Sequence, residues 1–304
     1  MTNYEFVLQD RIAKIQAINE QYDLENNAYI SFSGGKDSTI LSYLIDLALP
    51  NNKIPRLFLN TGIEYMAIVK YVKELASKDN RFIIYNVGVN IKEMLEKDGY
   101  PFKSKEHSHH LGIYQKSGIH KSVSKYLKLV DTSKRITCPK ALKYRFTEEF
   151  KIPVSDRCCI NLKKTPAKHW AKANNKTITL TGMRQGEQGQ RLKSTCIVTD
   201  KDNKLVKFHP LLVIDKEFEE EFIKQNSIQL CELYYPPYNF DRTGCKGCPF
   251  ALDLQEQLNK MEELLPNERK QCELIWGKVY NEYRRIGYRL NNNKQLSIYD
   301  LKER

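Results

Sequence analysis

One segment near the start of the chain combines glycines, hydroxyl groups and a lysine in a pattern suited to binding phosphate. Residues 33–39 read Ser-Gly-Gly-Lys-Asp-Ser-Thr and connect an apolar segment, residues 28–33, to a segment of helical periodicity, residues 37–49. Glycines let successive backbone N–H groups point at one anion, and the following helix adds the positive end of its dipole. Lys36 supplies a full charge, and Asp37 is placed to cap the helix or to hold a magnesium ion on the phosphates. The segment therefore predicts a phosphate loop.

This loop differs from a Walker loop, which needs a glycine, four residues, and then Gly-Lys-Ser/Thr. Ile30 stands where that first glycine belongs, and Asp37 follows the lysine. The alternative is a polar turn that binds nothing. The position of the segment after an apolar strand and before a helix disfavours that alternative.

Two further strand ends carry residues suited to the same site. Thr61 and Gly62 follow one predicted strand, and Thr181–Arg184 follows another. Ligands of open parallel sheets bind at the carboxyl ends of strands, where these elements would meet the phosphate loop. Arg184, and Arg191 beyond it, would direct their guanidinium groups at phosphate or sulfate oxygens. The alternative is that these arginines pair with surface carboxylates.

The cysteines form a second constellation. Cys158 and Cys159 are adjacent, and Cys245 and Cys248 form Cys-x-x-Cys in a glycine-rich turn. Four thiolates of this kind can hold an iron–sulfur cluster or a structural zinc ion. Adjacent cysteines are awkward for one cluster, so Cys158 is an uncertain ligand, and ordinary core cysteines are the alternative reading. The remaining cysteines have no partner at a useful spacing and are expected in the core or on the surface: Cys138, Cys196, Cys231 and Cys272.

Residues 102–120 break the helical and strand patterns. This stretch is rich in Ser, Lys, Gly and His, and it predicts a long loop, with a lid over the nucleotide as one role. It holds four of the six histidines, namely His107, His109, His110 and His120. A solvated loop is favoured over a metal site, because no cysteine or carboxylate lies at a useful spacing.

Alternation of apolar strands with helical segments predicts the fold. Strands are expected at residues 28–33, 56–60, 82–87 and 177–180, with a short extended piece at 206–210. Helices are expected at residues 4–22, 37–49, 64–77, 122–150, 215–225, 252–265 and 268–285. The pattern is typical of a Rossmann-like α/β fold, a parallel sheet with helices on both faces. We expect a nucleotide-binding domain over residues 1–235 and a cysteine-containing helical subdomain over residues 236–304.

Composition narrows the possible partners. The 304-residue chain carries a formal net charge of +12, which favours anionic partners such as nucleotides or nucleic acid. The alternative is a compositional bias, because many lysines adjoin asparagines. No signal peptide and no apolar run of membrane-spanning length is evident, so we expect a cytoplasmic, reduced protein with no membrane contact.

The phosphate loop resembles that of the PP-loop ATP pyrophosphatases, within the adenine nucleotide alpha hydrolase-like superfamily, whose motif is Ser-Gly-Gly-x-Asp-Ser/Thr. That resemblance implies a loop that binds the β- and γ-phosphates of ATP while a substrate is adenylated and pyrophosphate leaves. Thr61–Glu64 and Thr181–Arg184 resemble elements of one branch, the phosphoadenosine phosphosulfate (PAPS) reductase family, although Asn60 replaces an aspartate. Cys-Cys followed at long range by Cys-x-x-Cys resembles the arrangement that holds a 4Fe-4S cluster in adenylylsulfate reductases. The resemblance covers roughly residues 25–250.

Two departures separate the chain from the reductases of this family. Reductases carry a nucleophilic cysteine in a Cys-Gly-x-His context near the C-terminus, whereas residues 297–304 contain none and Cys272 lies within a predicted helix. Reductases also degrade the phosphate loop, which is intact here. These features resemble ATP-dependent sulfurtransferases, and they imply a sulfur donor protein (a cysteine desulfurase or a thioredoxin-like protein) and a possible nucleic-acid acceptor. The alternatives are an adenylylsulfate (APS) or PAPS reductase that borrows its thiol, and a non-catalytic nucleotide-binding module with structural zinc.

The predicted site thus has three groups of residues. The catalytic residues are expected to be Lys36 and Arg184. The residues expected to bind ATP, or APS or PAPS in its place, together with Mg²⁺, are Ser33, Gly34, Gly35, Lys36, Asp37, Ser38, Thr39, Thr61, Gly62, Gly182, Arg184 and Arg191. The expected ligands of the 4Fe-4S cluster, or alternatively of Zn²⁺, are Cys158, Cys159, Cys245 and Cys248.

Overall fold

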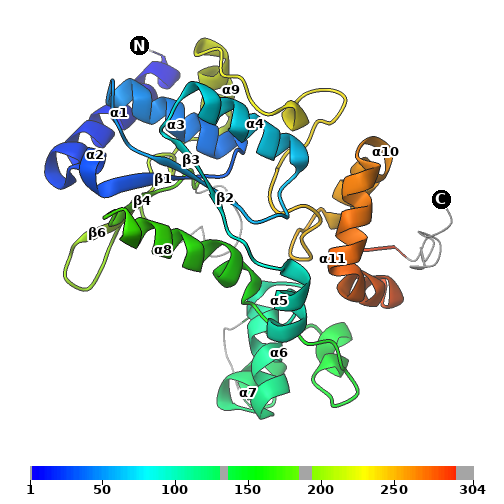
Figure 1. Cartoon of the computed structure of the whole chain (residues 1–304). Helices are drawn as coiled ribbons and strands as arrows, with labels where there is room; N and C mark the ends of the chain where they lie inside the picture. Colours follow the sequence, from blue (N-terminus) through cyan, green and yellow to red (C-terminus); the bar gives the residue numbers. More distant parts are fainter. Residues whose placement is uncertain (1, 131–135, 185–193, 292–304) are drawn as a thin grey trace. The chain divides into compact units, whose positions relative to one another are not determined.

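The computed structural model describes residues 2–130, 136–184 and 194–291 (Figure 1). The chain divides into two compact units, each built from two separate segments. The sheet unit comprises Met1–Val87 and Thr165–Gly244, and the cysteine unit comprises Gly88–Lys164 and Cys245–Arg304. The sequence predicts a boundary after residue 235, close to the end of the sheet unit. It does not indicate that residues 88–164 join the C-terminal segment.

The sheet unit is built on one sheet, which in the described residues has six strands in the order β3-β2-β1-β4-β6-β5. The strands are β1 (Ala28–Phe32), β2 (Arg56–Asn60), β3 (Phe82–Asn86), β4 (Ile178–Leu180), β5 (Ile197–Thr199) and β6 (Leu205–Phe208). All neighbouring pairs are parallel except β5 with β6, which is antiparallel. The predicted parallel sheet is confirmed. The edge strand β5 was not predicted, because three residues are too few to show a period of two.

Helices cover both faces of this sheet, as predicted. Helices α1, α3, α4 and α9 lie on one face, and α8 lies on the other (Figure 1). The helices of the sheet unit are α1 (Asn3–Tyr22), α2 (Leu24–Asn27), α3 (Lys36–Ala48), α4 (Met66–Lys78), α8 (Thr165–Ala173) and α9 (Lys216–Gln225). Tyr29 and Leu57 of the sheet pack against Trp170 and Ala171 of α8, with the rings of Tyr29 and Trp170 edge to face at 5.5 Å. Because both faces are covered, strand β1 is buried along nearly its whole length.

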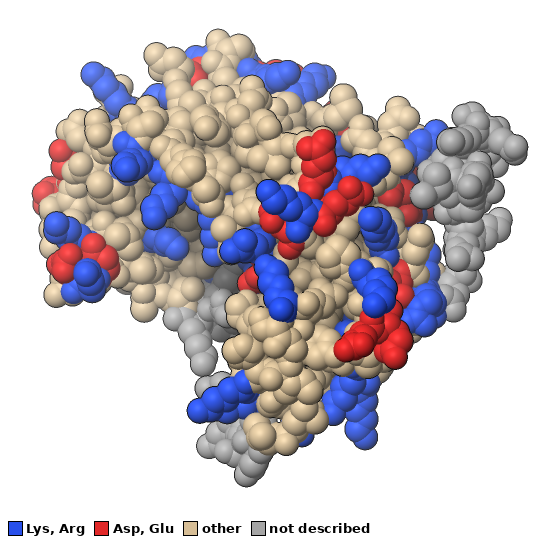
Figure 2. Space-filling view, turned by 60° about the horizontal axis from the view of Figure 1, so that its bottom comes forward, with Lys and Arg blue, Asp and Glu red and all other residues tan. Residues whose placement is uncertain are grey.

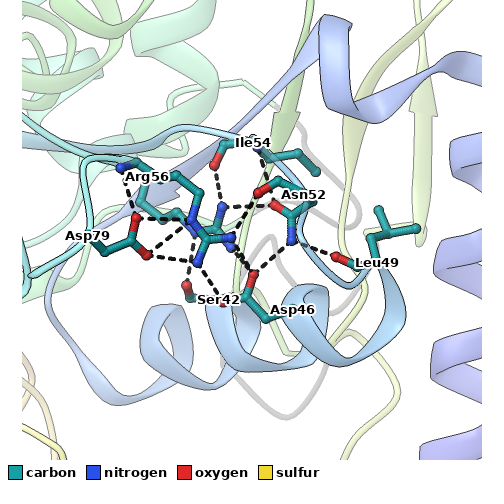
Figure 3. Close-up of polar contacts among 8 residues, drawn as sticks. Ser42, Asp46, Leu49, Asn52, Ile54, Arg56 and Asp79 are labelled. Atoms are coloured by element: carbon teal, nitrogen blue, oxygen red, sulfur yellow. Dashed lines mark hydrogen bonds and ion pairs between the residues drawn. The ribbon is translucent and has the colours of Figure 1, made fainter.

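A buried arginine lies at the start of β2, at the amino edge of the sheet. Arg56 is 0% exposed, and Figure 3 shows how its guanidinium is enclosed by acceptors. Its Nε donates to Ser42 Oγ at 3.1 Å, Nη1 donates to Asn52 Oδ1 at 3.0 Å and to the carbonyl of Ile54, and Nη2 pairs with Asp46 at 2.6 Å. Burial lowers the pKa of Arg56 to about 10, against the opposing effect of Asp46. The network joins α3 to β2 at the edge opposite the predicted site.

The cysteine unit is mainly helical in its described residues. Its helices are α5 (Ile91–Asp98), α6 (Lys105–Ser117), α7 (Lys121–Leu127), α10 (Leu254–Leu264) and α11 (Pro266–Arg285), with a 3₁₀ segment η1 (Lys140–Arg145) and a π-helical segment η2 (Ile160–Lys164). The predicted loop over residues 102–120 is wrong, because α6 fills most of it. Ser104 caps this helix by accepting a hydrogen bond from the N–H of His107 at 3.2 Å. Its buried face consists of His107, Ser108, Leu111 and Gly112, so no large apolar stripe marks it in the sequence.

The predicted helix over residues 122–150 is only partly correct. Helix α7 ends at Leu127, where Lys128 takes a left-handed conformation with φ +58°, and a short 3₁₀ segment begins after Pro139. The other predicted helices and strands begin and end within two residues of their observed bounds. No helix in the described part of the chain is long and apolar enough to cross a bilayer.

Candidate nucleotide site and cysteine cluster

The predicted phosphate loop lies between β1 and α3, and its own hydroxyl groups hold its shape. Gly34 has φ +71°, and a Cβ there would lie 2.8 Å from Ile68 Cγ2, so the position requires glycine. The N–H of Ser33 donates to Ser38 Oγ at 3.2 Å, and Ser38 Oγ donates to the Gly35 carbonyl at 2.9 Å. The loop is thus already folded in its turn, with the hydroxyl groups of Ser33 and Ser38 beside its backbone.

A tyrosine that the sequence did not indicate joins this loop. The OH of Tyr234, in the 3₁₀ segment η4 (Glu232–Tyr234), accepts a hydrogen bond from the N–H of Lys36 at 2.9 Å. It also lies 2.6 Å from Thr243 Oγ1, and burial raises the pKa of Tyr234. The phenol therefore accepts from an N–H in the first turn of α3, which has no acceptor within the helix. Nothing in the local sequence signals this contact, because the partners lie 198 residues apart.

Lys36 and Arg184, the predicted catalytic residues, meet around a buried carboxylate. Lys36 Nζ lies 3.3 Å from Glu219 Oε1, and Arg184 Nη1 lies 2.9 Å from Glu219 Oε2. Arg184 Nε also pairs with Asp37 Oδ1 at 3.0 Å. The Glu219 side chain is 0% exposed, and burial raises its pKa while the two cations oppose that shift. Two positive charges aimed at one buried point are suited to an anion, and here a side chain on α9 takes that place.

The sequence does not single out Glu219, because it is one of four glutamates on α9. Glu217, Glu220 and Glu221 give the helix the pattern of a solvated face, whereas Glu219 is buried with Phe218 and Phe222. Only the packing of α9 distinguishes this carboxylate from its neighbours.

A glycine after β4 brings Arg184 to the phosphate loop. A Cβ on Gly182 would lie 2.7 Å from the carbonyl oxygen of Asp37, so glycine permits the close approach of this segment to the start of α3. Thr181 Oγ1 lies 2.6 Å from His209 Nδ1 on the adjoining segment. The structure therefore brings Gly182 and Arg184 to the loop. Arg191 lies outside the described residues.

The turn after β2 is closed by its own glutamate. The N–H and Oγ1 of Thr61 donate to the carboxylate of Glu64 at 2.9 and 2.8 Å, and Gly62 has φ +86°. Asn60, which stands where the resembling family has aspartate, donates through Nδ2 to Asn86 Oδ1 at 2.8 Å. Glu64 thus shapes the Thr-Gly turn, a role that its spacing of three residues could have indicated.

All four predicted metal ligands fall in the cysteine unit, and no disulfide joins them. Burial raises the pKa of Cys158, and the charges of Cys159, Cys245 and Cys248 raise it further. The pKa of Cys248 is raised to about 12, mainly by burial, with Cys245 and Cys159 adding to the shift. The fold therefore brings the two pairs into electrostatic range of one another. Within the described ranges, no group of three or more His, Cys, Asp or Glu is arranged as a set of metal ligands.

Helix α11 supports the loop that carries Cys245 and Cys248. Trp276 Nε1 donates to the carbonyl of Lys246 at 3.1 Å, and the OH of Tyr280 donates to the carbonyl of Gly247. Gly247 has φ +58°, and a Cβ there would lie 2.7 Å from the sulfur of Cys272. Cys272 is fully buried, and burial raises the pKa of this thiol to about 12. Its setting is therefore that of a packed core residue, which matches the interpretation of this cysteine from the sequence.

The family of the chain follows from comparison with known proteins. The family described as phosphoadenosine phosphosulfate reductase domain matches residues 27–132 and 119–251. The chain belongs to this family. An uncharacterized protein of Methanocaldococcus jannaschii is 25% identical over 291 residues, which is 92% of this chain and 55% of that protein. The chain therefore spans about half the length of this curated relative.

Several solved structures are similar at low identity. The PAPS reductase of Candida auris, in a phosphate complex, is 16% identical with a TM-score of 0.44 over 76% of this chain and 87% of that one. The FMN adenylyltransferase of Candida glabrata, in complex with ATP, is 14% identical with a TM-score of 0.45 over 78% and 61%. The NH₃-dependent NAD synthetase of Campylobacter jejuni is 14% identical with a TM-score of 0.39 over 98% and 99%. These similarities are distant, and the strand order and the family match define the fold.

The positive net charge is spread out on the face shown in Figure 2. Lysine and arginine side chains there are interspersed with smaller groups of aspartate and glutamate, and other residues form most of the face. In that view the described basic side chains form no single large patch. The charge therefore adds little support for an extended nucleic-acid surface on this face.

Proposed function

We propose that this member of the PAPS reductase family binds ATP on residues 33–39, cleaves it between the α- and β-phosphates, and uses the adenylated product in sulfur transfer. One observation carries the proposal: an intact Ser-Gly-Gly-x-Asp-Ser loop with Lys36 and Arg184 directed at one point beside it. An intact loop suits a substrate with β- and γ-phosphates, which APS and PAPS lack.

The residues of the site support this reaction as follows. Loop N–H groups and the start of α3 would bind the phosphates, and Asp37 would hold Mg²⁺. An acceptor oxygen would attack the α-phosphorus, the bond to the β-phosphate would break, and pyrophosphate would leave. Lys36 and Arg184 would stabilise the charge that develops on the leaving group. The outer sulfur of a persulfide on a donor protein, such as a cysteine desulfurase, would then attack the acceptor carbon and displace AMP. A second thiol of the donor would cleave the resulting S–S bond, so that the sulfur stays on the acceptor and the donor is left with a disulfide.

Glu219 is a positioning residue in this scheme. Its carboxylate holds Lys36 and Arg184 in one place and neutralises them in the buried site. A phosphate group would compete for the same two cations. The ion pairs therefore keep both side chains oriented for an anion, at the cost of some binding energy.

The four predicted ligands in the cysteine unit, Cys158, Cys159, Cys245 and Cys248, fit a bound metal by their chemistry. No disulfide joins them, and each pair shifts the pKa of the other, so thiolates there would repel one another unless a cation compensated them. We propose that Cys158, Cys159, Cys245 and Cys248 hold a 4Fe-4S cluster, which would supply redox or sulfur chemistry. A structural zinc ion is the alternative for the same donors.

A second candidate function is reduction of a sulfonucleotide, which the name of the family favours. The nucleophilic thiol would then come from a partner, because Cys272 is buried with a raised pKa. In that case APS or PAPS would bind more tightly than ATP. A non-catalytic nucleotide-binding module would release no pyrophosphate with any acceptor.

The nucleotide proposal is tested by calorimetric titration of ATP and APS into the whole chain, with pyrophosphate release as a second readout. Lys36→Ala should weaken ATP binding about 10- to 100-fold, because it removes a charge-assisted contact. Lys53→Ala is the matched control, since Lys53 is exposed and precedes β2 at the opposite edge of the sheet. Equal affinity in both variants would show that residues 33–39 do not bind the phosphates.

The metal proposal is tested by anaerobic purification with iron, sulfide and zinc analysis. About four irons per chain would support the cluster, and one zinc would support a structural site. Cys245→Ala and Cys248→Ala should lower the metal content, whereas Cys196→Ala in the sheet unit should not. Metal content unchanged by the first two variants would exclude these cysteines as ligands.

A further inference from the structure

A second buried arginine, in the cysteine unit, is bonded far less completely than Arg56. Arg145 ends η1 and is 0% exposed. Its guanidinium lies over the ring of Phe102, 3.4 Å from the centroid, and its Nε donates to the OH of Tyr144 at 3.0 Å. Its terminal nitrogens Nη1 and Nη2 are buried and have no hydrogen-bond partner among the described residues.

Stacking on Phe102 does not satisfy these nitrogens. A ring contacts the face of a guanidinium, whereas its N–H groups lie in the plane and need acceptors there. The nearest paired carboxylate, Glu282, lies 3.9 Å from Nε and already accepts hydrogen bonds from Tyr144 and Arg285. Burying a charged group without hydrogen bonds is costly, so the fold presents a fork of donors that needs an acceptor.

No nearby thiol supplies the missing negative charge. Cys138 lies within electrostatic range of Arg145 and Lys103, which favour its thiolate. Burial outweighs them and raises the pKa of this thiol to about 11. Cys138 is therefore neutral near pH 7 and does not act as the counter-ion of Arg145.

A buried histidine beside Arg145 has a second unsatisfied nitrogen. His107 is 0% exposed; its Nδ1 lies 2.9 Å from the OH of Tyr126, and its Nε2 has no hydrogen-bond partner among the described residues. Burial lowers the pKa of His107 to about 3, and the charges of Arg145 and Lys103 add to that effect. His107 is thus neutral at neutral pH. If Tyr126 donates to Nδ1, then Nε2 carries a proton and is a second buried donor.

We propose that the cysteine unit contains a binding site for a small free oxyanion of the sulfate or phosphate type, held by Nη1 and Nη2 of Arg145 with His107 as the adjoining donor. An arginine fork binds two oxygens of such an ion at once. The site selects a free ion over a phosphate within a polymer, because neither side chain has exposed surface. It is separate in sequence and in unit from the phosphate loop.

The route that we assign to such an ion lies on the same unit. A pocket of about 350 Å³ is lined by Tyr144, Phe150, Glu282 and Arg285, among other residues. Tyr144, Phe150 and Glu282 also contact the guanidinium of Arg145. Three of the lining residues are therefore neighbours of Arg145, although Arg145 and His107 do not themselves line the pocket. Rotation of these side chains would open the site to ions of this size.

The test uses the full chain in a Lys36→Ala background, so that anions bind more weakly to the phosphate loop. Sodium sulfate and sodium phosphate are titrated by calorimetry at an ionic strength held constant with sodium chloride. One saturable ion per chain is expected, and Arg145→Lys should weaken its binding at least about tenfold, because a lysine cannot bind two oxygens through a planar fork. Arg157→Lys is the matched control, since Arg157 is exposed in the same unit.

A second variant covers the case in which Arg145→Lys does not fold. His107→Phe keeps an aromatic ring and removes both nitrogens. It should lower the affinity for the ion severalfold, whereas Arg157→Lys should leave that affinity unchanged. The proposal is overturned if neither ion binds more tightly than chloride in the Lys36→Ala chain. It is equally overturned if binding is the same in the Arg145 or His107 variant and in the Arg157 control.

Discussion

Two fully buried arginines, one in each unit, show how differently the same side chain can be used. The donors of Arg56 in the sheet unit reach Ser42, Asn52, the carbonyl of Ile54 and Asp46 (Figure 3). Arg145 in the cysteine unit uses one nitrogen on Tyr144 and leaves two without partners among the described residues. Burial alone therefore does not reveal the role of an arginine. The hydrogen-bond partners of each guanidinium nitrogen do reveal that role.

The physical difference lies in where the counter-charge comes from. Asp46 belongs to the helix that packs on β2, so folding itself brings the anion to Arg56 and the network is complete within the chain. Glu282, the carboxylate paired with Arg145, is held at 3.9 Å by other donors. A complete network stabilises the fold, whereas an incomplete one is free to bind a ligand.

The largest effect that sharpens this comparison is expected for Arg56→Met. The substitution removes the hydrogen bonds that Arg56 donates to Ser42, Asn52, the Ile54 carbonyl and Asp46. Asp46 keeps its pair with Arg81, so the cost comes from these lost buried bonds and should be about 3 kcal/mol of the free energy of unfolding. Urea denaturation followed by circular dichroism measures it. A loss below about 1 kcal/mol would mean that the network of Arg56 is not structural.

A pH dependence of intermediate size is expected from His107. Its pKa is lowered to about 3 in the folded chain, mainly by burial, against about 6.5 when unfolded. Between these pH values the unfolded chain binds more protons than the folded chain. The contribution of His107 to the free energy of unfolding is therefore fully present above about pH 6.5, and the free energy of unfolding falls as the pH decreases below that value. The slope is at most about 1.4 kcal/mol per pH unit.

Urea denaturation between pH 7.5 and pH 5 measures this slope, with His107→Phe as the comparison. The variant should lose the part of the slope that His107 contributes. His209 and His110 also have lowered pKa values, so some dependence should remain. Identical slopes in both proteins would contradict a buried, neutral His107.

The smallest effect is expected for Arg145→Met, measured in chloride buffer without sulfate or phosphate. Replacing a buried, poorly paired charge by an apolar side chain of similar size is often neutral or stabilising, so the change should stay below about 1 kcal/mol. In the Lys36→Ala background, saturating sulfate should raise the free energy of unfolding of the chain with Arg145 more than that of the Arg145→Met chain, because only the former gains from an ion bound at Arg145. A loss as large as that of Arg56→Met in chloride would break the comparison between the two arginines.

The sequence alone indicates the phosphate loop, the parallel sheet and most element bounds. Each of these depends on local information: periodicity along one segment, a glycine that allows a tight turn, or a strand followed directly by a helix. The loop at residues 33–39 is contiguous, so its chemistry can be read without the fold. The sequence pattern does not predict helix α6, because histidine, serine and glycine form most of its buried face in place of large apolar residues.

Only the tertiary structure decides which charged groups become partners. Glu219 and Tyr234 reach the phosphate loop from distant elements, and Arg145 lies buried among the aromatic residues of the other unit. Their sequence surroundings resemble those of exposed residues. The energy of a buried charge depends on the acceptors that folding brings within about 3 Å, and these come from segments that local patterns do not connect.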